Sequence, residues 1–443
     1  MSETTENQPV AVPARAIRAG EILQLMFWVE PTIWTERMLT ALFQGVKGGK
    51  WFSLIDKVHR ERTLTAAFSN VARNQGAAGV DHVTIAMFEK HLDENLKKLS
   101  DQLRNGTYRP QAIRRHYIPK PGSKEQRPLG IPTVRDRVVQ TALRMTIEPI
   151  FEREFAEHSY GFRPGRGCKD ALRRVNALLK LGHMYIVDAD LKSYFDSIPQ
   201  DRLLALVSQK ISDGRVLTLI EAFLKQGVLD GLREWTPETG SPQGAVISPL
   251  LSNIYLNPLD HLMAQDGIEM VRYADDFVIL CRTPADAARA LARVQEWTAA
   301  AGLTLHPTKT RIINATQDAF EFLGYRFDRG RRYPRAKSMQ KLKDTIRAKT
   351  KRTSGKCLLA IIASLNPTLR GWFEYFKHSY RLTFPIVDKW VRMRLRSILR
   401  KRMGLRGRGR GADHHRWPNA FFAELGLYSL KTAHAAACQS SSR

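Results

Sequence analysis

The spacing of apolar residues divides the chain into a helical first part, a middle part with strands and a helical last part. From residue 51 to 104 apolar residues recur at helical intervals, with a glycine-containing loop at 74–81. Three short apolar runs have the length of strands, at 185–187, 270–273 and 277–280. The last two flank a short polar turn, so the pattern predicts a β-hairpin there and an α+β fold.

The last part of the chain is helical and strongly basic. A helix is predicted over 284–301, and in 384–399 the apolar residues share one helical face while most basic residues lie on others. Between residues 326 and 410 there are 26 lysines or arginines and four acidic residues, which carry +22 of the net charge of +27. Charge of this density on folded helices predicts a polyanionic partner, and we expect nucleic acid.

The cysteines and the hydropathy argue against several other classes of protein. The four cysteines are scattered without a CxxC pair, which favours neither a disulfide framework nor a cysteine-rich zinc site. No apolar run has the length of a membrane span, and the polar N-terminus resembles neither a secretion signal nor a transit peptide. We therefore expect no membrane partner and a cytoplasmic location of bacterial type, in association with the nucleoid or a ribonucleoprotein.

Acidic residues gather at the ends of the predicted strands. Asp275 and Asp276 lie in the hairpin turn, where adjacent carboxylates repel one another unless a cation neutralises them. Asp190 ends another apolar strand 85 residues earlier in the chain. If these strands are neighbours in one sheet, the three carboxylates converge in the arrangement that holds two Mg²⁺ ions roughly 3.5–4 Å apart. Magnesium prefers such oxygen ligands.

A loop with a Pro-Gln-Gly sequence precedes a predicted helix. It spans Ser241–Gly244, and Ser248–Tyr255 follows it. Glycine and proline allow a close backbone approach there, and a glutamine amide can bond to a sugar or a base edge.

Further blocks occur in order through nearly the whole chain. They are Asn74–Asp81, Arg127–Pro132, Ser159–Gly165, Asp188–Phe195, Ser241–Tyr255, Tyr273–Asp276, Leu303–Thr310, Phe322–Tyr325 and Leu365–Trp372. In this order they resemble the reverse transcriptases of group II introns, with Tyr273–Asp276 as the YxDD box and Leu365–Trp372 as the maturase-specific thumb motif. The resemblance implies a right-hand polymerase, with fingers, a palm built on an antiparallel sheet and a helical thumb.

The resemblance also divides the chain into units. It implies a partly disordered N-terminal extension over residues 1–50, fingers and palm over 51–328, a basic helical thumb and maturase domain over 329–403, and a basic tail over 404–443. The tail is a candidate DNA-binding appendage. Its histidines and cysteine lack metal-ligand spacing, so no endonuclease is expected. Priming would then use a target with an existing 3′ end, such as a replication fork.

Carried over position by position, the resemblance assigns roles to residues of the palm. Asp190, Asp275 and Asp276 would be the catalytic metal ligands for two Mg²⁺ ions, which Mn²⁺ can replace, and the Leu191 carbonyl would be an extra ligand. Phe195 would lie under the sugar as a steric gate that favours deoxynucleotides. Without the resemblance, a phenylalanine at this position would be read as a core residue.

The remaining predicted contacts are basic or polar residues. Lys120 and Arg127 would clamp the triphosphate, Gln243 would contact the incoming nucleotide, and Lys309 would neutralise a phosphate. The thumb would follow a template–primer duplex by its phosphates and shape. Its candidate nucleic-acid contacts are Arg370, Trp372, Arg392, Arg396 and Arg400, although aromatic residues in this segment are more often core residues than base-stacking ones.

The expected function is RNA-directed DNA polymerisation, in which dNTPs extend a DNA primer on an RNA template. Binding of a structured group II intron RNA would promote splicing and mobility into a target DNA. Two alternatives stay open: an RNA-binding splicing factor with little polymerase role, and a domesticated reverse transcriptase in defence or DNA repair. The intact set of three aspartates argues against the first. Whether a group II intron encloses the reading frame would separate them.

Overall fold

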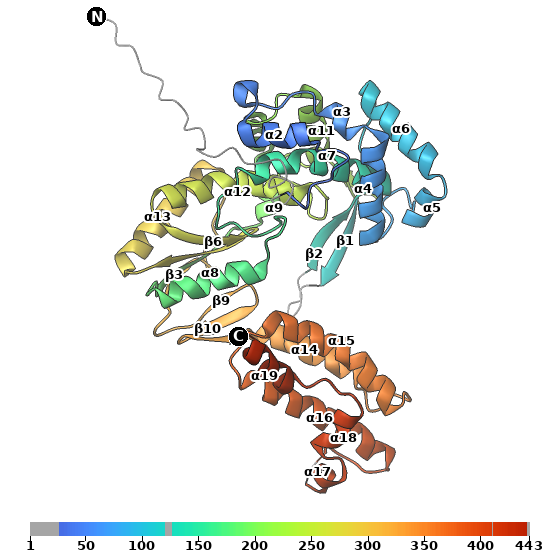
Figure 1. Ribbon diagram of the computed structural model, residues 1–443, viewed down its shortest axis with the longest axis vertical. Helices are drawn as coiled ribbons and strands as arrows, with labels where there is room; N and C mark the ends of the chain where they lie inside the picture. Colours follow the sequence, from blue (N-terminus) through green and yellow to red (C-terminus); the bar gives the residue numbers. More distant parts are fainter. Residues whose placement is uncertain (1–25, 120–125, 410, 441–443) are drawn as a thin grey trace, which may run out of the picture.

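The computed structural model describes residues 26–119, 126–409 and 411–440 (Figure 1). The disorder predicted for residues 1 to about 20 of the N-terminal extension and the predicted triphosphate contact Lys120 lie outside these residues. Within the described ranges, no helix is both long enough and apolar enough to cross a membrane.

Helices and a small sheet form the first part of the molecule, the fingers. Helix α4 packs on α7 and α6 packs on α4, which confirms the helical character predicted for residues 51–104. The sheet has the order β2-β1-β4-β5, with β1 antiparallel to β2 and parallel to β4. The elements are α2 (Glu36–Gln44), η1 (Lys47–Gly49), α3 (Ile55–Val58), α4 (Glu61–Asn74), α5 (Ile85–Glu89), α6 (Leu92–Asn105), β1 (Ile113–Pro119), β2 (Gln126–Ile131), α7 (Val134–Glu152), β4 (Val228–Asp230) and β5 (Arg233–Trp235).

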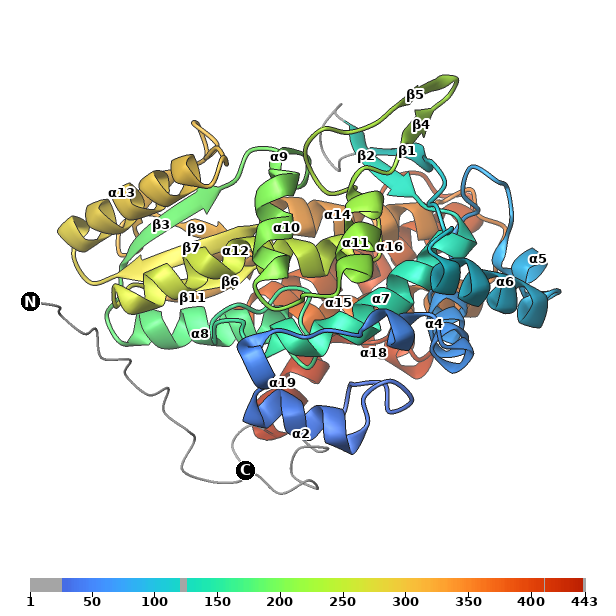
Figure 2. The same cartoon turned by 90° about the horizontal axis from the view of Figure 1, so that it is seen from above.

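The palm is an antiparallel sheet with helices on both faces (Figures 1 and 2). Its strand order is β6-β7-β3-β8, so the predicted hairpin of β6 and β7 is confirmed and β3 lies beside β7. The elements are α8 (Cys168–Lys180), β3 (Tyr185–Asp190), α9 (Tyr194–Ser197), α10 (Gln200–Ser208), α11 (Gly214–Leu224), α12 (Ser248–Gln265), β6 (Glu269–Tyr273), β7 (Asp276–Cys281), α13 (Pro284–Ala300) and β8 (Arg311–Asn314).

Alternation along the palm strands decides which face each residue takes. Val187 and Ile279 are buried in the core that includes α12 and α13, whereas Ile186 and Val278 are buried with residues of α8. Successive side chains of a strand point to opposite faces. Asp190 therefore lies on the same face of the sheet as Ile186. It is the last residue of β3, beyond the apolar residues that are buried with α8 on that face.

A small sheet joins the palm to the helical thumb. It has the order β11-β10-β9 and consists of β9 (Phe320–Phe322), β10 (Tyr325–Asp328) and β11 (Arg331–Pro334). The strands lie on both sides of the predicted boundary at residue 328. The hydroxyl of Tyr325 donates a 2.6 Å hydrogen bond to the Tyr375 carbonyl of the thumb, which ties the two units together.

The thumb is a helical unit that includes the tail. Its helices are α14 (Ala336–Lys349), α15 (Leu358–Phe376), α16 (Thr383–Arg402), α17 (Ala412–Arg416), α18 (Asn419–Glu424) and α19 (Leu430–Ser440). Trp417, Phe422 and Leu430 are buried in the same core as α14 to α16. The described part of the tail packs against the thumb helices, because its apolar residues complete the thumb core. The predicted domain boundaries, the tail over 404–443 among them, and a contact of the tail with DNA stay predictions.

Candidate active site

Three aspartates meet where two neighbouring palm strands end. Asp190, the last residue of β3, lies opposite Asp276, the first residue of β7. Residues paired in this way on antiparallel strands have Cα atoms about 4.5–5.5 Å apart. Asp275 precedes Asp276 in the two-residue turn between β6 and β7. The structure thus brings the three predicted carboxylates together at one end of the central strands of the palm sheet.

A basic side chain stands beside this cluster. The ammonium nitrogen of Lys309 lies 2.5 Å from Oδ2 of Asp190. The backbone N–H of His306 donates to the Asp190 carbonyl at 2.7 Å, which holds the loop that carries Lys309 against the end of β3. Leu191, the predicted extra ligand, has a buried side chain, and its backbone is bridged to Leu305. The Lys309 ammonium therefore supplies a positive charge directly beside the Asp190 carboxylate.

The donor types and the backbone positions fit divalent cations. Carboxylate oxygens are the ligands that hard divalent ions prefer, and one of the three already binds a cation, the Lys309 ammonium. In the described part of the chain, no three acidic, histidine or cysteine side chains surround a common point as they stand. An ion would therefore have to draw the three carboxylates inward from their neighbouring backbone positions.

The carboxylates are costly to ionise together. Lost hydration, together with the nearby charges of Asp188, Asp275 and Asp190, raises the pKa of Asp276 to about 7, although this side chain reaches solvent. Lost hydration and Asp190 also raise the pKa of Asp275. Crowded acidic groups with raised pKa values are typical of functional sites. A cation would relieve the repulsion.

Basic residues of the fingers and thumb line a cleft of about 580 Å³. Arg127 on β2 lines it, together with Arg335, Lys337 and Lys341 at the start of α14. The charge of Arg127 opposes the rise in the pKa of Asp275. The structure therefore places Arg127 where a fixed positive charge can act near the carboxylates. Its contact with a triphosphate stays a prediction.

Phe195 and the Pro-Gln-Gly loop lie together. The half-buried ring of Phe195 packs edge-on against Tyr194, with ring centres 5.4 Å apart. The backbone N–H of Ser241 donates to the Phe195 carbonyl at 2.7 Å. The Gln243 carbonyl accepts a 2.6 Å hydrogen bond from the Gly130 N–H of β2. Gln243 also lines a cavity of about 380 Å³ between palm and fingers. The roles of both side chains toward a nucleotide stay predictions.

The thumb residues predicted to contact nucleic acid differ in accessibility. Arg370 is exposed and Arg392 is half-buried, while Trp372 packs between the two cores that meet at the thumb. Arg396 is buried and donates to the Trp417 carbonyl at 2.9 Å and to Asn419. Arg400 is half-buried and pairs with Asp413 at 2.9 Å. Arg396 and Arg400 therefore anchor the tail segment in this structure, and their nucleic-acid contacts stay predictions.

Arg272 is a residue near the site that the sequence pattern did not single out. It lies in the apolar strand β6, immediately before the YxDD box, and its side chain is fully buried. Its guanidinium forms an ion pair with Asp260 of α12, in which the nearest atoms are 2.5 Å apart. Burial alone would lower the pKa of Arg272, but the carboxylate of Asp260 raises it, so the guanidinium stays charged. The signal in the sequence was a single charge within the apolar run 270–273, which was predicted as a strand.

Two family models match the chain. Residues 118–327 match the model for the reverse transcriptase, described as an RNA-dependent DNA polymerase. Residues 339–417 match the model for the maturase-specific domain of group II introns. The two matches follow one another in the order of palm and thumb.

Named relatives agree with these matches. The chain is 41% identical to the group II intron-encoded protein LtrA of Lactococcus lactis over 45% of this chain and 33% of that protein, so it matches about a third of that relative's length. It is 37% identical to protein YkfC of Escherichia coli K12 over 57% of this chain and 76% of that protein. A telomerase structure from Candida albicans aligns with a TM-score of 0.40 and 12% identity, covering 71% of this chain and 64% of that one. Because both family models match and protein YkfC is 37% identical over 76% of its length, the chain belongs to the reverse transcriptase and maturase family of group II introns.

Proposed function

We propose that this protein is an RNA-directed DNA polymerase that extends a DNA primer on an RNA template. The observation that carries the proposal is the pairing of Asp190 with Asp276 at the strand ends, with Asp275 in the adjoining turn. The test is extension of a labelled primer on a defined RNA template with dNTPs, with and without Mg²⁺. Failure of the wild-type protein to extend the primer under any divalent ion would overturn the proposal.

The carboxylates would hold two Mg²⁺ ions, with Mn²⁺ as a substitute and the Leu191 carbonyl as an additional donor. When bound, such ions activate the primer 3′-oxygen and stabilise the leaving pyrophosphate. Lys309, now paired with Asp190, would move to a phosphate of the nucleotide once the ions neutralise the aspartates. Arg127 and Lys120 would hold the triphosphate from the fingers side.

The pKa of Asp276 predicts that metal binding depends on pH. Because this pKa is raised to about 7, the folded metal-free protein keeps a proton that the unfolded chain loses near pH 4, and its stability falls as pH rises between these values. A divalent cation competes with that proton, so the increase in Tm on adding Mg²⁺ should be larger at about pH 8 than at about pH 6. Thermal melts of wild type and Asp276→Asn check this. An equal Mg²⁺ effect at both pH values in the wild type would contradict it.

We also propose that the thumb binds a structured intron RNA, as its match to the maturase domain suggests. A pocket of about 360 Å³ on the thumb supports this proposal, because four arginines and Trp390 line it and no acidic residue does. The arginines are Arg347, Arg352, Arg394 and Arg408. Among the ion pairs of the described residues, one involves these four arginines, and it joins Arg347 to Asp344 on the thumb surface. Clustered guanidinium groups repel one another, and a phosphate would relieve that repulsion.

The pocket leads to a prediction about salt dependence. Arg352 and Arg408 are exposed, so the double variant Arg352→Ala/Arg408→Ala should fold normally. Its RNA binding should weaken, and the slope of log K against log salt should become shallower by about 1–2, because each lost phosphate contact removes roughly 0.7–0.9. The matched control is Arg381→Ala/Lys389→Ala, which removes the same charge from exposed positions outside the pocket. Equal slopes for the two variants, measured by fluorescence anisotropy, would show that net charge alone matters.

A second candidate function is splicing assistance without DNA synthesis. The maturase-domain match favours it as an accompanying activity. Splicing of the flanking RNA, assayed beside primer extension, would separate the two activities. Insertion into a target DNA and use of dNTPs belong to the polymerase proposal and would fail with it.

A further inference from the structure

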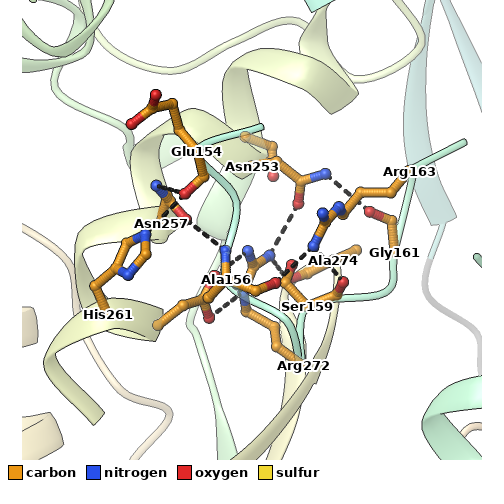
Figure 3. A network of polar contacts seen from close by, with 12 residues as sticks. Glu154, Ala156, Ser159, Gly161, Arg163, Asn253, Asn257, His261, Arg272 and Ala274 are labelled. Atoms are coloured by element: carbon orange, nitrogen blue, oxygen red, sulfur yellow. Dashed lines mark hydrogen bonds and ion pairs between the residues drawn. The ribbon is translucent and has the colours of Figure 1, made fainter. Parts of the chain in front are cut away.

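A buried polar network lies directly behind the turn that carries Asp275 (Figure 3). The Nε and Nη2 atoms of Arg272 donate to Asp260 at 2.7 and 2.5 Å. The Nη1 atom donates to Oδ1 of Asn253 at 2.9 Å and to the Ala274 carbonyl at 2.8 Å. Ala274 is the first residue of the turn. All three guanidinium nitrogens are thus engaged, and one of them holds the turn itself.

The backbone of Gly161 closes the other side of the turn. A Cβ atom at Gly161 would lie 2.1 Å from the Ala274 nitrogen, so this approach requires glycine. Asn253 links the two sides, because its Nδ2 donates to the Gly161 carbonyl at 2.8 Å while its Oδ1 accepts from Arg272. The turn is therefore held between the Arg272 side chain and the Gly161 backbone, and Asn253 bonds to both. We call Arg272, Gly161 and Asn253 together the clamp.

The anchors of the clamp come from one rigid element. Asn253 and Asp260 are two helical turns apart on α12, so they lie on the same face of that helix. The helix begins at Ser248, which accepts a 2.7 Å hydrogen bond from the Ser241 hydroxyl of the Pro-Gln-Gly loop. The turn and the loop predicted to contact the nucleotide therefore share a single support.

The clamp holds a conformation that the sequence disfavours. Ala274 has a φ of 59°, which at this position of a two-residue hairpin loop is usual for glycine. A buried ion pair contributes little net stability, because desolvation offsets most of its attraction. We propose that Arg272 is a positioning residue of the active site, which sets the orientation of Asp275 and Asp276 by holding the Ala274 carbonyl. This inference rests on the proposed polymerase function.

The test removes the ion pair as a whole. The variant Arg272→Met/Asp260→Leu leaves no unpaired buried charge, and apolar replacements of this kind are often tolerated. The matched control is Arg174→Met/Glu269→Leu, an ion pair at the opposite end of β6 in which the nearest atoms are 2.6 Å apart. Its hydrogen bond joins the two side chains and involves neither the turn nor the backbone of Gly161. Each variant is measured for Tm, for kcat and KM with dNTPs, and for Tb³⁺ luminescence as an activity-independent reading of cation binding.

We expect the Arg272 variant to lose about 100-fold in kcat with little change in KM, because small misplacements of catalytic groups have effects of this size. Its affinity for Tb³⁺ should fall as well. The control should keep most of its kcat and its Tb³⁺ affinity at a similar Tm. Arg272→Lys should recover part of the activity, since an ammonium group can still donate to both Asp260 and the turn, and this variant decides the matter if the double variant does not fold.

Two outcomes would overturn the inference. One is wild-type kcat and Tb³⁺ affinity in the Arg272 variant. The other is an equal loss in both double variants that follows their loss of Tm, which would make Arg272 purely structural. If the wild-type protein shows no extension, the polymerase proposal fails, but Tb³⁺ binding still reports on Arg272.

Discussion

Replacing Asp275 with alanine is expected to abolish primer extension on an RNA template while RNA binding survives. The residue lies in the turn between β6 and β7, next to Asp276 and near enough to Asp190 for the two charges to interact. Without its carboxylate, the proposed cations would lose one of their three aspartate ligands. Their electrostatic stabilisation of the transition state is worth several kcal/mol, and each 1.4 kcal/mol is tenfold in rate, so kcat should fall by about a thousandfold or more.

The fold should tolerate this change, which separates loss of chemistry from loss of structure. Lost hydration raises the pKa of Asp275, so the ionised side chain is unfavourable in the folded metal-free protein. Its removal should leave Tm unchanged or slightly raised. The control is Asp318→Ala, an exposed carboxylate of the palm outside the strand ends, which should keep full activity. Primer extension is measured on gels and RNA binding by anisotropy. Undiminished extension by Asp275→Ala would refute the assignment of the site.

The main strands of the palm could be predicted because each contains a nearly continuous apolar run of strand length. The runs at 185–187, 270–273 and 277–280 appear as β3, β6 and β7, and the hairpin follows from the short turn between the last two. The prediction of a joint metal site assumed that β3 and β7 are neighbours and could not derive it. Contacts between residues 85 positions apart leave no local pattern in the sequence. The small sheet β9–β11 and the fingers sheet were not predicted, because their strands are short or rich in arginine and proline.

Buried charges explain most of what the sequence did not reveal. A helical face rich in arginine is normally solvated, yet Arg396 is buried because Trp417 and Asn419 of the tail accept its hydrogen bonds. Arg272 is buried for the same kind of reason, since Asp260 meets it from a helix that precedes its strand. Neither partner can be read from periodicity, because each depends on how distant segments pack. For charged residues in apolar segments, the sequence pattern alone does not show whether the side chain is buried or which residue it pairs with.

Replacing Phe195 with alanine is expected to weaken discrimination against ribonucleotides. The Ser241 N–H donates to the Phe195 carbonyl, and a Cβ at Gly240 would lie 2.7 Å from that same oxygen, so the loop and the α9 backbone are in close contact. The backbone of Phe195 therefore has a fixed place beside the loop predicted to contact the nucleotide. Removing it should create room for a 2′-hydroxyl, and steric selection of this kind is worth about 1–3 kcal/mol, or roughly 10- to 200-fold.

The measurement is the ratio of kcat/KM for a dNTP to that for the matching ribonucleotide. Phe195→Tyr keeps the ring and should keep the ratio, whereas Phe195→Ala should lower it by raising ribonucleotide use. Because the half-buried ring also packs on Tyr194, the alanine variant will lose some stability, and a Phe195→Val variant with a lower cost in packing should show the same direction of change. Loss of stability alone would reduce both nucleotide rates together and leave their ratio intact. An unchanged ratio in both small variants would assign Phe195 to the palm core and leave sugar selection to a residue that lines the cavity beside Gln243.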